Sequence, residues 1–247
     1  MSRWRAAGIH ISISALIGLI AATLIFGVWY PRPYSHAAGA DKLVLLLLGV
    51  DVVLGPLLTL IVFRAGKWGM RFDLTVIAIA QACAFLYGTS VVVRARPAFV
   101  VANIDRFSLV AANDITDADY AKATRPEFRS APWTGPRIIG ALLPTNVEER
   151  NKLVLEGSHG KDIDVMPKYY ADYADVAQML LGKAKSLDEL KMLHDENAPI
   201  VDAWLSDHQR NPADIVWLPL NARRANLAML LDKRTGQPLD AVSANPW

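Results

Sequence analysis

The sequence contains little of the chemistry that catalytic and metal sites require. Its single cysteine, Cys83, lies in an apolar run, so the residues after 93 can form neither an intrachain disulfide nor a thiolate metal site. His159, His194 and His208 are scattered and lack metal-ligand spacing. A nucleophile elbow of the Gly-x-Ser-x-Gly type and a phosphate-binding glycine loop are also absent. We therefore predict that the protein is not an enzyme and uses no metal or other cofactor.

Acidic residues are scarce in the first part of the chain. Residues 1–93 contain seven Lys or Arg but only three acids, Asp41, Asp51 and Asp73, whereas residues 94–247 contain 19 basic and 21 acidic residues. The hydrophobic content of 53% and the mean hydropathy of +0.22 are high for a globular protein, and the excess lies before residue 94. No basic patch is interleaved with aromatic residues, which argues against a nucleic-acid partner. The chain is predicted to join a basic membrane region, residues 1–93, to a folded domain, residues 94–247.

Three long apolar runs are present, at about 6–30, 43–63 and 74–93. Each has the roughly 20 residues that a helix needs to cross a bilayer core about 30 Å thick. The first run is too long for a signal-peptide core and is not followed by a cleavage site of small residues. We therefore predict three transmembrane helices embedded in the lipid bilayer.

The basic residues that flank these spans predict their orientation. Arg3 and Arg5 precede the first span, and Arg64, Lys67 and Arg71 lie in the short connection between the second and third. Short loops rich in Lys and Arg stay in the cytoplasm, whereas a long domain translocates largely regardless of its charge. This pattern predicts a cytoplasmic N-terminus, a Gram-negative inner-membrane location and a periplasmic domain after residue 93.

The second span contains an acidic residue near its middle. Asp51 is surrounded by Gly49, Gly55 and Pro56, and a carboxyl group in lipid must face other helices and find a partner there. The glycines allow a neighbouring helix to approach closely, and Pro56 leaves the carbonyl of residue 52 without its helical donor. Candidate partners for Asp51 are Gln81 in the third span and Ser12 or Ser14 in the first.

Two interpretations of Asp51 remain open. In the first, a protonated Asp51 holds helices together or contacts a partner helix, so that Asp51, Gly49, Gly55, Pro56 and Gln81 form an intramembrane packing or contact site. In the second, Asp51 is the proton or ion site of a membrane transporter or enzyme. A proton relay needs several titratable groups in line, and only His10 could join Asp51 here.

The C-terminal part has the pattern of an α+β domain with an antiparallel sheet. Strands are expected first, helices follow, and strands return at the end of the chain. Thr145 with Glu148, and Ser186 with Glu189, have the capping-box spacing that marks helix starts. The expected strands cover residues 99–107, 108–112, 215–218, 227–231 and 239–242. One helix is expected to start at residue 145, and three others are expected at 167–182, 186–196 and about 200–205. Residues 126–144 are expected to be irregular.

Several stretches resemble one known family. Residues 1–10, 28–31 and above all 48–63 are similar to the type IV pilin accessory proteins (the TfpX/TfpZ group). Shorter matches are Phe72-Asp73, Arg96-Pro97, residues 105–107 and the turn that contains Asp232 and Gly236. The resemblance covers the whole chain, is firmest up to about residue 115, and extends to 117–205 only in general layout.

The resemblance implies an inner-membrane factor of type IV pilus biogenesis. Such proteins are encoded beside a major pilin and stabilise it, like a chaperone, or modulate it before or during assembly. Expected partners are the major pilin and other pilus assembly proteins. We hypothesise that Asp51 and its glycines hold the bundle together or dock a pilin helix, while the C-terminal domain binds the pilin head. No catalytic residues are implied by the resemblance.

Overall fold

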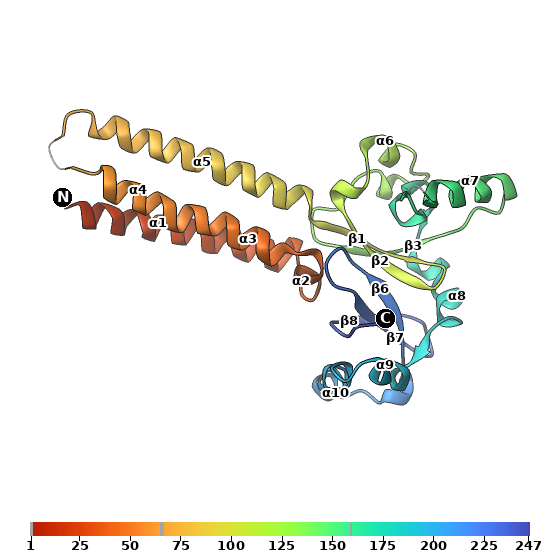
Figure 1. Cartoon of the computed structure of the whole chain (residues 1–247). Helices are drawn as coiled ribbons and strands as arrows, with labels where there is room; N and C mark the ends of the chain where they lie inside the picture. Colours follow the sequence, from red (N-terminus) through yellow and green to blue (C-terminus); the bar gives the residue numbers. More distant parts are fainter. Residues whose placement is uncertain (1, 65–66, 159) are drawn as a thin grey trace.

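The structure, a computed structural model, describes residues 2–64, 67–158 and 160–247, so His159 lies outside the described residues. A bundle of long helices projects from one side of a domain built on a β-sheet (Figure 1). The N-terminus lies at the far end of the bundle, and the C-terminus lies in the domain. The three apolar runs and the sheet-containing domain confirm the predicted membrane protein with an α+β domain.

The first membrane helix comprises α1 (Arg3–Leu24) and a π-helical turn, η1 (Ile25–Trp29). After the short α2 (Tyr34–Ala38), the second consists of α3 (Ala40–Gly49), a second π-helical turn η2 (Val50–Leu54), and α4 (Gly55–Val62). The third is α5 (Met70–Arg94). Each is long and apolar enough to cross a membrane, and most of their large apolar side chains face outward, as lipid contact requires.

The domain-side ends of the membrane helices are tightly packed. Ile25, Tyr30, Ala40, Val44, Leu47 and Val92 form a small buried core there. The hydroxyl of Tyr30 donates a 2.8 Å hydrogen bond to the carbonyl of Val92, which joins the end of the first helix to the end of the third. At the opposite end, α1 packs mainly on α4, and α5 diverges from α1 (Figure 1).

The sheet contains eight strands among the described residues, with the order β4-β3-β1-β2-β6-β7-β8 and β5 paired to β6. The strands are β1 (Pro97–Asn103), β2 (Arg106–Ala111), β3 (Arg137–Ala141), β4 (Tyr170–Ala171), β5 (Lys185–Ser186), β6 (Ile215–Asn221), β7 (Leu227–Asp232) and β8 (Pro238–Val242). Most neighbours are antiparallel, as predicted. The β1–β3 and β2–β6 pairs are parallel, so the sheet is mixed.

Alternating side chains of the central strands build cores on both faces of the sheet. Val216, Leu218 and Leu220 of β6 join one core with Val100 of β1, whereas Trp217 points to the other face. That second face carries two separate clusters. In the first cluster, α6 (Asp117–Tyr120) and α7 (Val147–Ser158) pack against β1 and β3. In the second, α9 (Leu187–Leu193) and α10 (Asn197–His208) pack against β6, β7 and β8.

Several local predictions are confirmed. Ser186 accepts a hydrogen bond from the backbone nitrogen of Glu189 and begins α9 as expected. The strands expected near 215–218, 227–231 and 239–242 are β6, β7 and β8. Pro199 lies inside the first turn of α10, where a proline costs no helical hydrogen bond, so the expected short helix there is longer than predicted.

Other local predictions are wrong. The expected strand 99–107 is interrupted by a tight turn at Ile104, whose φ is +40°, so β1 and β2 form a hairpin. Asn146 rather than Thr145 caps α7, because the side-chain oxygen of Asn146 accepts hydrogen bonds from the backbone N–H groups of Glu148 and Glu149. The stretch expected to be irregular contains β3. The helix expected at 167–182 is broken into short turns, β4, and α8 (Ala177–Leu181).

Candidate functional site

Asp51 lies in the π-helical turn of the second membrane helix. The residue is only 8% exposed, and its Oδ1 atom has no hydrogen-bond partner among the described residues. π-Helical turns within longer helices frequently occur at functional sites. A buried carboxyl oxygen without a donor is costly in a medium of low dielectric, so this atom requires a donor from another molecule or from a rearranged side chain.

Gln81 of α5 contacts the same turn, through the backbone rather than the carboxyl group. Its Nε2 atom donates to the carbonyl oxygen of Asp51 over 3.4 Å. The Gln81 Oε1 atom, like Asp51 Oδ1, is buried without a partner. Gly55 makes this approach feasible, because a Cβ atom at residue 55 would lie 1.8 Å from Gln81 Nε2. The second and third membrane helices therefore meet at Asp51, Gly55 and Gln81.

A polar contact also joins the first and second membrane helices. The Nδ1 atom of His10 and the Oγ1 atom of Thr59 lie 2.6 Å apart, within hydrogen-bond distance. Ser14 is buried near Asp51, whereas Ser12 bonds to the carbonyl of Gly8 in its own helix. The role of Thr59 was not predicted from sequence. The four-residue spacing of Asp51, Gly55 and Thr59 was the available signal, since it describes one small and polar helix face.

The remaining candidates of the second span have different surroundings. Pro56 is buried in the first turn of α4, next to Gly55. A Cβ atom at Gly49 would meet nothing within 4 Å, so the structure gives this glycine no close helix contact. A tight contact that sequence analysis missed occurs at Gly88 of α5, where a Cβ atom would lie 2.5 Å from Leu47 Cδ1.

Asp51 lines two hollows between the membrane helices. The first, which we call the Asp51 groove, has a volume of about 360 Å³ and lies between α1 and α5. It is lined by His10, Ser14, Asp51, Gln81 and apolar residues that include Ala78 and Ala82. The second, of about 370 Å³, lies between α3 and α5 and is almost wholly apolar apart from Asp51. Both offer apolar surface with a buried carboxyl group at their edge.

A second group of contacts fixes the domain against the bundle. The indole nitrogen of Trp29 donates to the carbonyl of Trp133 over 3.0 Å, across 104 residues of sequence. The guanidinium of Arg96 donates to the carbonyl of Pro132 and lies 4.6 Å from the centre of the Trp133 ring. Gly135 has a φ of +90° and passes close to the carbonyl of Val28. These contacts hold the loop around Trp133 at the end of the first membrane helix.

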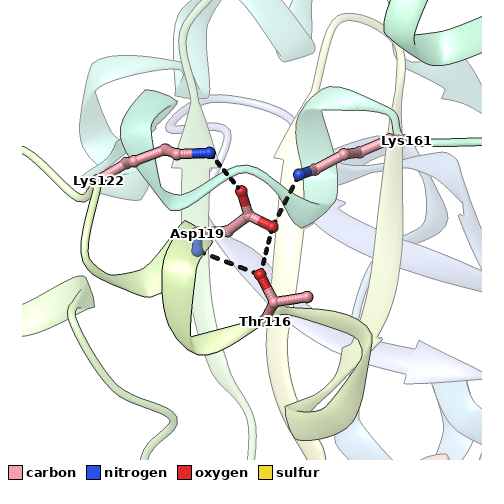
Figure 2. Close-up of polar contacts among 4 residues, drawn as sticks. All are labelled: Thr116, Asp119, Lys122 and Lys161. Atoms are coloured by element: carbon pink, nitrogen blue, oxygen red, sulfur yellow. Dashed lines mark hydrogen bonds and ion pairs between the residues drawn. The ribbon is translucent and has the colours of Figure 1, made fainter.

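The domain also contains a buried carboxylate, Asp119, which lines a charged pocket of about 440 Å³. Figure 2 shows the side chains around this carboxylate. Lys161 and Lys122 bind its two oxygens at 2.7 and 3.0 Å, and Thr116 donates to it at 2.7 Å. Burial alone would raise the pKa of Asp119, but the hydrogen bonds from Lys161, Thr116 and Lys122 outweigh it and hold that pKa well below its ordinary value. Because Thr116 caps α6, this cluster ties α6 to the segment after α7.

The two histidines in the described part of the domain make structural contacts. His194 bonds to the carbonyl of Trp247, and His208 stacks on Trp204. Among residues 2–64, 67–158 and 160–247, no group of three or more His, Cys, Asp or Glu side chains is arranged to hold a metal ion.

Comparison with known proteins gives consistent matches. The sequence profile of a family described as "Fimbrial assembly protein FimB" matches residues 1–39. The fimbrial assembly proteins of serogroups I and E1 from Dichelobacter nodosus are each 33% identical to this chain, over 92% of its length and 89% of theirs. A third, of serogroups C1 and C2 of the same organism, is 39% identical over 44% of this chain and 84% of its own. No solved structure matches significantly.

Proposed function

Since this chain belongs to the family of fimbrial assembly proteins, we propose that it binds a pilin subunit in the membrane, through the Asp51 groove. Membership of the family supports a role in fimbrial biogenesis that is structural and not enzymatic. The relatives are named for assembly, and their names do not state what they bind. Pilin binding is the more specific step, and it rests on the membrane helices.

The observation that carries the proposal is the unpaired oxygen of Asp51. Within a bilayer, water does not satisfy a buried polar atom, so a donor must come from protein. Asp51 Oδ1 and Gln81 Oε1 are both buried without partners among the described residues, and both belong to residues that line the Asp51 groove. A helix laid in this groove would cover the apolar wall formed by Ala78 and Ala82, and it would supply donors to these oxygens once the Asp51 and Gln81 side chains rotate toward it.

A pilin before assembly is suited to such a site, because it is a membrane helix that carries a globular head. The groove between α1 and α5 would receive the helix, and the domain would contact the head. At the end of the domain away from the bundle, α7 exposes Val147 and Val154, seven residues apart on one helix face (Figure 1). These side chains, 66% and 71% exposed, are the surface that we assign to the pilin head.

We further propose that the chain belongs to the type IV pilin accessory group, TfpX/TfpZ, within the wider family. In this role it stabilises or modulates the pilin, as a chaperone does, before or during assembly. Contact with other pilus assembly proteins follows from the same role. The groove favours a transient contact, because its volume of about 360 Å³ fits a few side chains of a passing helix.

We propose the inner membrane as the location, with a cytoplasmic N-terminus, and we divide the chain into a membrane region (1–93) and a periplasmic domain (94–247). Trp4 and Trp68, 67% and 97% exposed, occur at the end of the bundle away from the domain, where interfacial tryptophans are common. Arg3, Arg5 and Lys67 lie at this same end, which the positive-inside rule assigns to the cytoplasm.

Replacing Asp51 tests the proposal. Asp51→Leu removes the acceptor but keeps the bulk, and we expect few surface pili at a normal level of the protein. Asp51→Asn keeps a hydrogen-bonding side chain that cannot titrate, and we expect near-normal piliation. Normal piliation with Asp51→Leu would sink the proposal. Loss with both variants would instead favour a proton or ion site at Asp51.

A further inference from the structure

A hollow of about 310 Å³ lies where the membrane helices meet the domain. We call it the junction cavity. Its lining includes Leu43 at the start of α3 and Val91 near the end of α5, together with Arg223 and Arg224 from the β6–β7 loop. We propose that the junction cavity binds a membrane phospholipid, with the two arginines on the phosphate and the apolar wall against the first carbons of an acyl chain.

The position of the cavity matches the headgroup layer of a bilayer. Leu43 lies in the first turn of α3 and Val91 in the last turn of α5, so both lie at the domain-side ends of the apolar spans, where lipid chains end. Trp29 and Trp133 are joined by a hydrogen bond at the same end of the bundle, and Trp133 is 68% exposed. Tryptophan is enriched at this depth of membranes. The inference holds for either orientation of the chain, because it concerns the layer next to the domain.

The two arginines are held differently. Arg223 forms an ion pair with Asp114, which also lines the cavity. The Arg224 guanidinium has no hydrogen bond or ion pair with the described residues. Arginine binds phosphate with a planar fork of donors, which suits it to phosphate recognition. Arg224 is therefore the cation available to a ligand, and Asp114 orients Arg223 beside it.

The backbone positions Arg224 over the membrane helices. Its amide donates a 2.9 Å hydrogen bond to the carbonyl of Ala37 at the end of α2. Gly39 follows with a φ of +78°, and a Cβ atom there would lie 2.8 Å from Arg224 Nε. The glycine thus leaves room for the arginine side chain against the α2–α3 turn. This arrangement places a guanidinium at the rim of an apolar hollow.

The lining favours a phospholipid over a free phosphate ion. Leu43, Val91, Pro97 and Leu109 form an apolar wall that a phosphate ion would not contact. An amphiphile with a phosphate next to an acyl chain matches both the cationic rim and this wall. Phospholipids are also the abundant phosphate esters at this depth of a bilayer.

Lipid titration of the full-length chain tests the site. Protein purified in detergent and stripped of lipid is titrated with phosphatidylglycerol, and bound lipid is counted by native mass spectrometry. We expect one tightly bound lipid molecule per chain. Arg224→Gln should lower the affinity for phosphatidylglycerol roughly tenfold, the effect of losing one charged hydrogen-bonding group. Arg224→Lys keeps the charge and retains most of the affinity. Arg210→Gln, at an exposed position after α10, is the matched control with unchanged affinity.

Two further experiments distinguish a phospholipid from a free phosphate ion and provide a second variant in case Arg224→Gln misfolds. Inorganic phosphate and diacylglycerol, each alone, bind far more weakly than phosphatidylglycerol if both parts of the lipid are recognised. Ala95→Leu, at the residue that follows α5, narrows the cavity without changing the arginines, and it also weakens the binding of phosphatidylglycerol. Unchanged affinity in both Arg224→Gln and Ala95→Leu, or inorganic phosphate binding as tightly as the lipid, overturns the proposal.

Discussion

The side-chain amide of Gln81 on α5 reaches the backbone carbonyl of Asp51 over 3.4 Å, through the space that Gly55 leaves open. A residue larger than glycine at position 55 would collide with this amide. The contact joins the second and third membrane helices beside the Asp51 groove. The contact depends on the Gln81 side chain and on the space at Gly55, so combined substitution of these two residues tests it.

Gly55→Ala should push the Gln81 amide away from Asp51 and destabilise the helix bundle by about 1 kcal/mol, the usual contribution of one hydrogen bond. Gly49→Ala is the control, because a Cβ atom there meets nothing within 4 Å. It should be neutral or slightly stabilising, by up to about 1 kcal/mol, since alanine favours helix. Unfolding by titration with a denaturing detergent measures both.

The double variant Gly55→Ala/Gln81→Ala sharpens this test. With the Gln81 amide removed, the added methyl group at residue 55 has room, so the double variant should cost less than the sum of the single ones. Strict additivity would mean that Gly55 and Gln81 do not depend on each other.

Tyr30→Phe should loosen the domain-side end of the bundle. The Tyr30 hydroxyl is buried and donates to the carbonyl of Val92 at 2.8 Å, so its removal leaves an acceptor with one fewer partner. We expect a loss of about 1–2 kcal/mol. Tyr34→Phe is matched, because the Tyr34 hydroxyl makes no hydrogen bond with the described residues, and it should change thermal unfolding little. Equal effects of the two variants would contradict this role for Tyr30.

Asp119→Asn should destabilise the domain by about 1–3 kcal/mol at neutral pH, because two lysines lose a buried, hydrogen-bonded anion. Asp117→Asn, on the exposed side of α6, should cost less than about 0.5 kcal/mol. Thermal unfolding of the full chain in detergent compares the two variants with the parent protein.

The Asp119 effect should also depend on pH with a defined sign. The pKa of Asp119 is lower in the folded protein than the value of about 3.9 expected in an unfolded chain. Its stabilisation is therefore fully present above about pH 4 and is lost as the pH falls toward the folded-state pKa. The stability gap between the parent protein and Asp119→Asn should narrow below pH 4. A gap that stays constant there would contradict the charged cluster.

The membrane helices and the final strands could be predicted from sequence because their signals are local. Each span is a continuous apolar run, and β6, β7 and β8 are joined by short turns. The β3 strand was missed because it pairs in parallel with β1, far away in sequence. The segment expected as a helix at 167–182 crosses the sheet edge instead. Tyr170 packs in the core on one face, and Tyr173 packs in the core on the other.

The candidate site, like the fold, could be predicted from sequence only in part. An acid, glycines and a proline in one span point to Asp51 from sequence alone, and Gln81 could be named as a neighbour. The π-helical turn at Asp51 and the pairing of His10 with Thr59 arise from packing between helices, which a single span does not encode. The Trp29–Trp133 contact joins residues 104 positions apart, and no local pattern predicts it.

The most direct test of pilin docking is site-specific photo-crosslinking in cells that assemble pili. A photoreactive residue at Ala82 lies in the Asp51 groove, and one at Cys83, the next position on α5, points away from it toward lipid. Ala78 and Ile79 form a second matched pair one turn earlier. The account predicts crosslinks to the pilin from Ala82 and Ala78 that are absent from Cys83 and Ile79. Equal capture of pilin from both members of each pair, or none from either, would contradict it.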